Sequence, residues 1–288
     1  MKRAATIWSE GTRLAGDLFI PDDLGADEKR PAILLCHGWG GPKQHLSSTY
    51  APFFCEAGFV CLTFDYRGWF ESDARLVVDD AQPEPDADGY VSVRARPVRE
   101  VVDPLDQIAD ITNCLDFLVG EECVDTARVG LWGSSYGSGH VVQVAGTDSR
   151  IRCVVSQVGA PNPVLSPEMA RMAEQRATEK ARGHYGPLPP GIDGHPTLAG
   201  KPDWAKMSRY RPIDVASNIR VPTLLIDQEQ EELFDRNEQY PRLVKIIEPN
   251  APVAYHTLEG THYDVYDKNY RQSARLARDW FVEHLKRG

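Results

Sequence analysis

Short apolar runs recur along this chain, and most of them end at glycine or other turn-forming residues. They cover residues 31–36, 59–64, 129–132, 151–158, 221–226 and 253–258. Continuous apolar runs of this length are typical of strands buried on both faces of a parallel sheet. Residues 1–20 instead alternate apolar and polar positions around the pair Glu10 and Gly11, which predicts an antiparallel hairpin at a sheet edge.

Segments of helical length lie between the apolar runs. The clearest begins with Asp103 as N-cap and Pro104 at the first helical position, and apolar residues then follow at spacings of three and four up to Leu118. Helices are also predicted over residues 166–182 and 268–284. Because strands and helices alternate, we predict an α/β fold with a mostly parallel central sheet and helices on both faces.

Two segments interrupt this alternation. Residues 73–102 are rich in acidic side chains and show little helical period, which predicts a long excursion over the surface. Residues 161–212 hold nine of the 21 prolines and lie between two core strands. Since long loops in compact domains are often functional, we predict that residues 161–212 form a cap over the carboxyl edge of the sheet and that residues 1–160 and 213–288 form the core. A solvated surface loop is the alternative for the cap.

The net charge of the chain limits the classes of partner that it is expected to bind. The 288 residues include 32 Lys and Arg against 42 Asp and Glu, a formal net charge of −10. Without a basic block, the chain lacks the electrostatic footprint for nucleic acid or an anionic membrane, so we expect neither. It has no run of about 18 apolar residues and no visible export signal, and its six cysteines lack metal-ligand spacing. We expect a cytoplasmic protein with reduced thiols. The sequence leaves open whether the protein forms a homo-oligomer.

The strongest chemical signal is a serine between two glycines. The apolar run 129–132 is followed by Gly133-Ser134-Ser135-Tyr136-Gly137 and then by a segment compatible with a helix. A nucleophile on a tight strand-to-helix turn needs small residues two positions before and two after it. The start of the following helix also favours developing negative charge. We therefore predict Ser135 as a nucleophile and Ser134 as a small buried packing residue.

Two further segments are expected at the same edge of the sheet. Residues 37–41 carry the sequence His-Gly-Trp-Gly-Gly after a core strand, where a glycine-rich loop can aim backbone N–H groups at an oxyanion. We predict the amides of Trp39 and Tyr136 as the two donors. His262 follows the last apolar run and precedes the last helix, so we predict its imidazole as the base for Ser135.

On these motifs the chain resembles the α/β-hydrolase superfamily. It is most similar to the branch that contains dienelactone hydrolases, bacterial acyl esterases and prolyl-peptidase-like hydrolases, over nearly the whole chain outside the two insertions. Residues 64–72 resemble the DxRGxGxS turn of this family, with Phe70 in place of the second glycine. The resemblance implies the α/β-hydrolase fold and a catalytic triad in the order serine, acid, histidine.

The resemblance also implies a catalytic acid after the seventh strand. Relatives carry a glycine, two residues and an aspartate there; in this chain Gln228 replaces the glycine and Glu231 occupies the aspartate position. A glutamate can also orient and support an imidazole. We predict Glu231 as the acid, with Asp227 as the alternative closer to the strand end. The other acids nearby are expected at a solvated helix start: Glu229, Glu232 and Asp235.

The type of nucleophile limits the class of reaction that we expect. Serine at this turn points to acyl transfer to water through an acyl-enzyme, whereas cysteine or aspartate marks other members of the superfamily. We expect a serine hydrolase of small to medium carboxylic esters, with a small-molecule ester as partner and no cofactor or metal. A peptidase or amidase, or an acyltransferase or thioesterase, would use the same triad. A binding protein that has lost catalysis is the alternative of a different class.

Several other side chains have weaker interpretations. His184 and His195 flank a loop rich in proline and glycine, but no carboxylate or thiolate lies at ligand spacing from them. His45 and His140 either line the site or have structural roles, and we expect structural roles. Four large side chains of residues 161–212 either line an acyl or alcohol pocket or pack within the cap: Met169, Met172, Trp204 and Tyr210.

Overall fold

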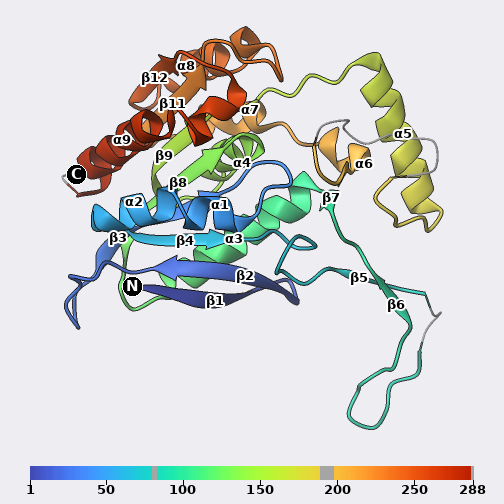
Figure 1. Ribbon diagram of the computed structural model, residues 1–288. Coiled ribbons are helices and arrows are strands. Elements are labelled where there is room, and N and C mark those ends of the chain that lie inside the picture. Colours follow the sequence, from blue (N-terminus) through green and yellow to red (C-terminus); the bar gives the residue numbers. More distant parts are fainter. Residues whose placement is uncertain (80–82, 189–197, 287–288) are drawn as a thin grey trace.

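One eight-stranded sheet forms the centre of the molecule (Figure 1). The computed structural model of the protein describes residues 1–79, 83–188 and 198–286. In sheet order, the strands are β1 (Lys2–Ser9), β2 (Thr12–Phe19), β4 (Val60–Phe64), β3 (Arg30–Cys36), β8 (Val124–Ser134), β9 (Ile151–Gln157), β11 (Thr223–Gln228) and β12 (Val253–Leu258). β2 runs antiparallel to β1 and β4, and the other neighbours pair in parallel. The predicted α/β fold is confirmed.

Helices cover both faces of the sheet. Alternate residues of a central strand face opposite sides, and the residues on each side pack against different helices. Leu34 of β3 belongs to a core cluster shared with α3 and α4, whereas its neighbours Ile33 and Leu35 belong to a cluster shared with α2 and α9. Burial on both faces explains the continuous apolar runs of the central strands. The helices are α1 (Lys43–Ser47), α2 (Tyr50–Glu56), α3 (Pro104–Val119), α4 (Tyr136–Ala145), α5 (Pro167–Ala181), α6 (Trp204–Met207), α7 (Pro212–Val215), α8 (Tyr240–Ile247) and α9 (Tyr270–Phe281), with a π-helical turn over Val282–Lys286 and 3-10 turns η1 (Ala216–Asn218), η2 (Arg236–Glu238) and η3 (His262–Tyr266).

Local signals in the sequence agree with the observed element boundaries. Glu10 and Gly11 have φ angles of 49° and 81° in the turn between β1 and β2, as a two-residue hairpin turn requires. Asp103 caps α3, because its carboxylate accepts hydrogen bonds from two backbone N–H groups of the first helical turn. The helices predicted over 166–182 and 268–284 are α5 and α9. Within the described ranges, no helix has the length and apolar character that crossing a membrane requires.

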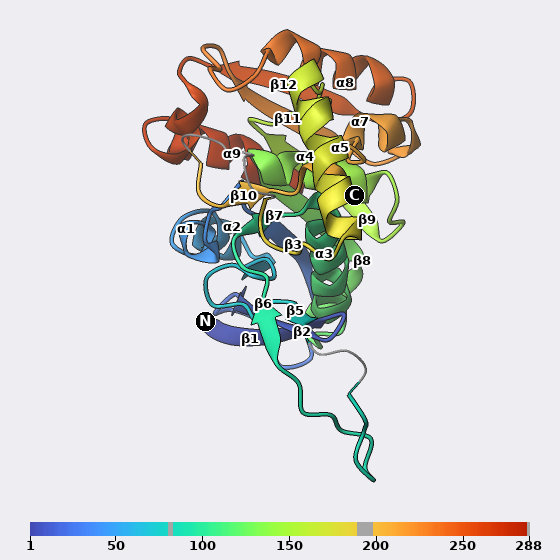
Figure 2. The same ribbon diagram turned by 90° about the vertical axis from the view of Figure 1, so that its right-hand side faces the viewer.

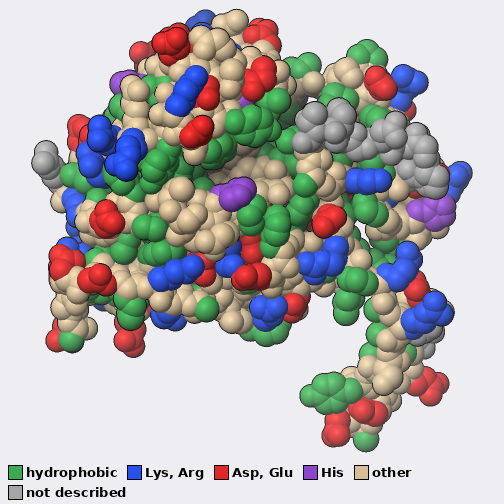
Figure 3. All heavy atoms as spheres, in the orientation of Figure 1, with side chains coloured by type: hydrophobic (Ala, Val, Ile, Leu, Met, Phe, Trp, Pro, Cys, Tyr) green, Lys and Arg blue, Asp and Glu red, His purple; other side chains and the backbone are tan. Residues whose placement is uncertain are grey.

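The described parts of both predicted insertions lie outside the central sheet, and the two insertions contact each other. Residues 73–102 contain β5 (Leu76–Val78) and β6 (Ala95–Pro97), which pair antiparallel, and then β7 (Val101–Val102). Residues 83–94 project away from the rest of the molecule (Figure 2), and acidic side chains gather near the far end of this projection (Figure 3). β10 (Lys201–Pro202), from the second insertion, pairs in parallel with β7.

Residues 161–212 are called the cap segment below, and their described parts, 161–188 and 198–212, lie beyond the ends of the parallel strands. Figure 1 shows α5 and α6 of this segment at that side of the sheet. An ion-pair cluster ties the segment to α3: the Lys206 Nζ atom lies 2.6 Å from the Asp103 carboxylate and 3.1 Å from that of Asp106. The division of the chain into a core and a cap stays a prediction.

The turn after β4 accommodates Phe70 in place of a glycine. Phe70 has a φ of 39°, in the left-handed region that favours glycine. Below it, the buried Asp65 carboxylate accepts hydrogen bonds from the backbone N–H groups of Lys43 at 2.7 Å and Glu71 at 3.4 Å. The Phe70 side chain is 48% exposed. Replacing the glycine of this motif with Phe70 therefore places backbone strain at one exposed residue.

Candidate active site

Ser135 lies at the turn between β8 and α4, where the parallel strands end. Its backbone angles, φ 56° and ψ −122°, are strained for a residue with a side chain. A Cβ atom on Gly133 would lie 2.3 Å from the carbonyl oxygen of Gly137. A Cβ atom on Gly137 would lie 2.5 Å from two backbone carbonyl oxygens at the end of β3. Only glycine fits these positions, so close packing of the turn explains the spacing of the motif.

A continuous chain of hydrogen bonds links Ser135, His262 and Glu231. The Nε2 atom of His262 lies 2.9 Å from the Ser135 Oγ atom, and its Nδ1 atom lies 2.7 Å from the Glu231 Oε2 atom. The side chains of His262 and Glu231 are 1% and 0% exposed. The other Glu231 oxygen accepts the backbone N–H of Leu233 at 2.9 Å, which orients the carboxylate. The structure thus brings together the predicted nucleophile, base and acid.

The loop after β12 places the imidazole. His262 is the first residue of η3, and Thr261 caps this turn through a reciprocal pair of hydrogen bonds with Asp264. In that pair, the Thr261 backbone N–H donates to the Asp264 carboxylate at 2.6 Å. A Cβ atom on Gly260 would lie 2.5 Å from the same carboxylate, so glycine is needed directly before the cap. Local structure therefore orients His262 toward the strand ends.

The expected solvated helix start at Glu229, Glu232 and Asp235 is only partly correct. Asp235 does begin a short helix, since its carboxylate accepts the backbone N–H of Asn237 at the start of η2. Glu232, in contrast, accepts the backbone N–H of His262 at 2.8 Å and so helps to hold the base. The partners are 30 residues apart, and no local pattern in the sequence marks this contact.

Asp227, the alternative acid, is held in a different contact. Its carboxylate accepts hydrogen bonds from the Tyr255 hydroxyl at 3.0 Å and from the backbone N–H of Gln228 at 3.0 Å. The residue is fully buried at the end of β11. Burial raises the pKa of Asp227 to about 6. Of the two candidate acids, the structure places Glu231 and not Asp227 against the imidazole.

Asp227 is expected to make the free energy of unfolding depend on pH. Its pKa rises from 3.8 to about 6 on folding, so between these values the folded protein binds more protons than the unfolded chain. The stabilisation is full below about pH 4 and is lost as the pH rises through 6, by on the order of 3 kcal/mol. Denaturant titrations of Asp227→Asn and the wild type should show the variant gaining relative stability between about pH 4 and pH 7.5. Parallel pH profiles would contradict this.

Ser134 is buried as expected, but its hydroxyl does more than pack. The Ser134 oxygen lies 2.6 Å from the Tyr266 hydroxyl and accepts a hydrogen bond from Gln157 Nε2 at 3.1 Å. Gln157 also donates to the Tyr50 hydroxyl at 3.1 Å. This network joins β8 to β9, α2 and η3, so it anchors the strand end next to Ser135. The residue types alone do not reveal it, because its members come from distant parts of the chain.

The glycine-rich loop after β3 passes directly beside the nucleophile. A Cβ atom on Gly38 would lie 2.8 Å from the Ser135 Cβ atom. Trp39 follows in this loop, and Tyr136 begins α4 next to Ser135. The rings of Trp39 and Tyr136 pack edge to face with their centroids 5.3 Å apart. Both residues therefore lie near Ser135, and their role as oxyanion donors stays a prediction.

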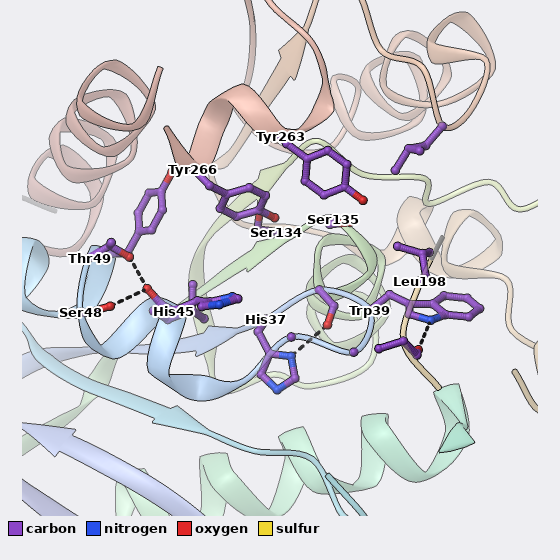
Figure 4. A pocket seen from close by; sticks show the side chains of 17 residues that line it. His37, Trp39, His45, Ser48, Thr49, Ser134, Ser135, Leu198, Tyr263 and Tyr266 are labelled. Atoms are coloured by element: carbon purple, nitrogen blue, oxygen red, sulfur yellow. Dashed lines mark hydrogen bonds between the residues drawn. The ribbon is translucent and has the colours of Figure 1, made fainter. Parts of the chain in front are cut away.

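A cavity of about 540 Å³ opens over Ser135 (Figure 4). One end carries the polar side chains of His45, Ser48 and Thr49, so His45 lines the cavity although a structural role is expected for it. A volume of this size suits a small molecule. The aromatic and aliphatic side chains of the wall are those of Trp39, Leu46, Tyr50, Leu198, Ala199, Leu233, Tyr263 and Tyr266.

The four large side chains of the cap segment that the sequence singles out pack within the protein and do not line this cavity: Met169, Met172, Trp204 and Tyr210. Met169 and Met172 pack against a small buried cluster that contains Trp204. The Tyr210 hydroxyl lies 2.8 Å from Nδ1 of His140, whose pKa burial lowers to about 3. His140 is therefore a neutral, buried structural residue, as expected. The cap segment instead contributes Leu198 and Ala199 to the cavity wall.

Of the two histidines near the proline-rich loop, the structure describes only His184. His184 pairs with Glu179 of α5, and His195 lies outside the described residues. Across the part of the chain that the structure describes, no three His, Cys, Asp or Glu side chains are grouped so that they could hold a metal ion.

Known proteins share the architecture of this chain. A family model described as alpha/beta hydrolase fold matches residues 31–191. A 31.7 kDa protein from the traX-finO intergenic region of Escherichia coli is 29% identical over 89% of this chain and 92% of its own length. The quorum-quenching protein AidA of Acinetobacter baumannii is 27% identical over 60% of this chain and 53% of its own. The structure of Est1E from Butyrivibrio proteoclasticus with bound ferulic acid matches with a TM-score of 0.69 at 18% identity, over 98% of this chain and 100% of that chain.

Proposed function

Because this chain belongs to the α/β-hydrolase family, we propose that it is a serine hydrolase that cleaves carboxylic esters of small to medium size. The observation that carries the proposal is the hydrogen-bond chain from Ser135 through His262 to Glu231. Ser135 lines a cavity of about 540 Å³, so a nucleophile and a space for a small ester coincide.

In the proposed reaction, the Ser135 Oγ atom attacks the acyl carbon while His262 Nε2 accepts its proton. The carbonyl oxygen becomes an oxyanion, which accepts hydrogen bonds from the backbone N–H groups of Trp39 and Tyr136. The bond to the alkoxy oxygen then breaks, and His262 gives its proton to the leaving alcohol. Water then attacks the acyl-enzyme while His262 accepts its proton. The bond between the acyl carbon and the Ser135 Oγ atom breaks, the acid leaves, and His262 returns the proton to Oγ.

Glu231 would hold His262 in the form that this reaction needs. Its carboxylate accepts a hydrogen bond from Nδ1–H, so the proton stays on Nδ1 and the Nε2 lone pair faces Ser135. When His262 becomes an imidazolium, the buried carboxylate stabilises the positive charge. Glu231 lies three residues beyond the end of β11, and from there its longer side chain reaches the imidazole at 2.7 Å.

The side chains that line the cavity favour a substrate with an aromatic or short aliphatic group. Trp39, Tyr263 and Tyr266 present rings to the cavity, and Ser48 and Thr49 at one end keep oxygen lone pairs for a substrate donor, since both hydroxyls already donate to backbone carbonyls. The similar fold of Est1E, whose structure holds ferulic acid, makes aryl esters a sensible part of the test.

The setting of the reaction belongs to the same proposal. Leu198 and Ala199 line the cavity, which supports residues 161–212 as a cap over the site. The net charge of −10 supports a small ester, rather than nucleic acid or an anionic membrane, as the partner. We propose that the protein works in the cytoplasm.

A substrate panel tests the proposal. We expect the purified protein to turn over p-nitrophenyl acetate, butyrate and aryl esters faster than an acyl thioester or an aminoacyl nitroanilide, and a fluorophosphonate probe to label Ser135 as located by mass spectrometry. Faster thioester or anilide turnover would shift the assignment to a thioesterase or a peptidase. Absence of both turnover and label would indicate a binding protein.

A further inference from the structure

A hydrogen bond joins the cap segment to the loop beside the nucleophile. The indole Nε1–H of Trp39 donates to the backbone carbonyl of Ala199 at 2.9 Å, across 160 residues of sequence (Figure 4). Trp39 is also the residue whose backbone N–H we expect to bind the oxyanion. The side chain of Trp39 thus contacts the cap segment, while its backbone N–H is the expected oxyanion donor.

Residues 198–203, called the strap below, are held firmly on their other side. The backbone N–H groups of Lys201 and Asp203 each donate at 2.9 Å to carbonyl groups flanking β7 or within it. Gly200 has a φ of 71°, and a Cβ atom there would lie 2.3 Å from Trp69 and 2.6 Å from the Glu100 carbonyl oxygen. The strap therefore follows one defined path, so its Ala199 carbonyl is a fixed acceptor for the indole.

The loop that carries Trp39 closely follows the strap. A Cβ atom on Gly40 would lie 3.1 Å from both the Cβ and the carbonyl oxygen of Ala199. On its other side, the Trp39 ring packs against Tyr136, the residue that carries the second expected donor. The strap, Trp39 and Tyr136 thus form one packed row beside Ser135.

We propose that Trp39 is a positioning residue through which the strap sets the geometry of the oxyanion site. The indole bond to Ala199 holds the loop of residues 38–41 at the distance from Ser135 at which the Trp39 backbone N–H meets the oxyanion. The strap is then both a wall of the substrate cavity and a support for transition-state binding. This inference rests on the proposed ester hydrolysis.

Trp39→Phe tests the role, because phenylalanine keeps an aromatic ring next to Tyr136 and removes the N–H donor to Ala199. We expect kcat and kcat/KM for p-nitrophenyl acetate to fall by the same factor, about 3- to 10-fold, with KM unchanged, since a donor displaced from the oxyanion weakens transition-state binding. Fluorophosphonate titration of active sites, together with a thermal unfolding scan, separates this effect from a loss of folded protein.

Trp280→Phe is the matched control, because it is the same substitution at a site that belongs to neither the strap nor the loop beside Ser135. Trp280 lies on α9, packs against the core cluster shared by α2 and α9, and contacts the His284 ring with centroids 4.3 Å apart. We expect Trp280→Phe to lower the unfolding temperature while kcat per active site stays within about twofold of the wild type.

Gly200→Ala tests whether the effect passes through the strap. The added methyl group must displace the strap, so we expect a kcat loss similar to that of Trp39→Phe, and no further loss when the two changes are combined. Additive losses would overturn the coupling, as would a Trp39→Phe variant with wild-type kcat. If the wild type hydrolyses esters and Trp39→Phe matches it, only this inference fails. If the wild type and Ser135→Ala are equally inactive, the proposed function fails and the inference falls with it.

Discussion

Ser135→Ala is expected to lower kcat for ester hydrolysis by at least about 10⁴-fold while the protein stays folded. The change removes the Oγ atom that lies 2.9 Å from His262 Nε2, so no acyl-enzyme can form. Alanine keeps the Cβ atom and hence the same backbone strain at a φ of 56°, so the unfolding temperature should change little. Steady-state kinetics on p-nitrophenyl butyrate, at matched concentrations of folded protein, measures the loss.

Ser134→Ala provides the control, since it removes a hydroxyl from the adjacent residue. The Ser134 oxygen contacts Tyr266 and Gln157, so its removal loosens the strand end and leaves the bond between Ser135 and His262 in place. We expect a kcat loss below about tenfold and a measurable drop in stability. Equal activity of Ser135→Ala and the wild type would remove Ser135 from the mechanism.

Glu231→Gln is expected to lower kcat by about 10²- to 10⁴-fold. The backbone N–H of Leu233 donates to Glu231 Oε1, so a glutamine keeps its carbonyl oxygen there and turns its NH₂ group toward His262 Nδ1. Nδ1 must then accept a hydrogen bond, and the imidazole proton moves to Nε2. In that tautomer Nε2 cannot take the proton of Ser135. Steady-state kinetics on p-nitrophenyl butyrate, at matched concentrations of folded protein, measures the loss of kcat.

Asp227→Asn is the matched change at the alternative acid. Asparagine can still accept the Tyr255 hydroxyl through its amide oxygen, and the wild-type carboxylate does not contact the imidazole. We expect kcat within about threefold of the wild type, even though the pH dependence of stability changes. A larger kcat loss from Asp227→Asn than from Glu231→Gln would transfer the role of acid to Asp227.

The predictable part of the fold comes from local patterns. The hairpin turn at Glu10 and Gly11, the N-cap at Asp103 and the six apolar runs each depend on a few neighbouring residues, and all appear in the structure. The glycines around Ser135 are of the same kind, because close packing within one turn demands them. Such signals survive in the sequence because the contacts that cause them are short-range.

The contacts missed by the sequence are long-range. Glu232 holds the backbone of His262, Tyr266 meets Ser134, and Trp39 meets the strap, each through partners far apart in the chain. No periodicity or spacing marks such pairs. They form only when the sheet brings the ends of β3, β8, β11 and β12 to one edge.

By itself, the sequence determined the α/β architecture, the strand-to-helix turn with Ser135, and the place of His262 after the last strand, because hydrophobic period and steric limits at glycine act locally. Tertiary structure alone decided that Glu231 rather than Asp227 reaches the imidazole, and that Leu198 and Ala199 rather than the methionines of the cap segment line the cavity. These contacts depend on the relative positions of loops from separate strands, with a precision of about an ångström. The type of a residue does not encode those positions.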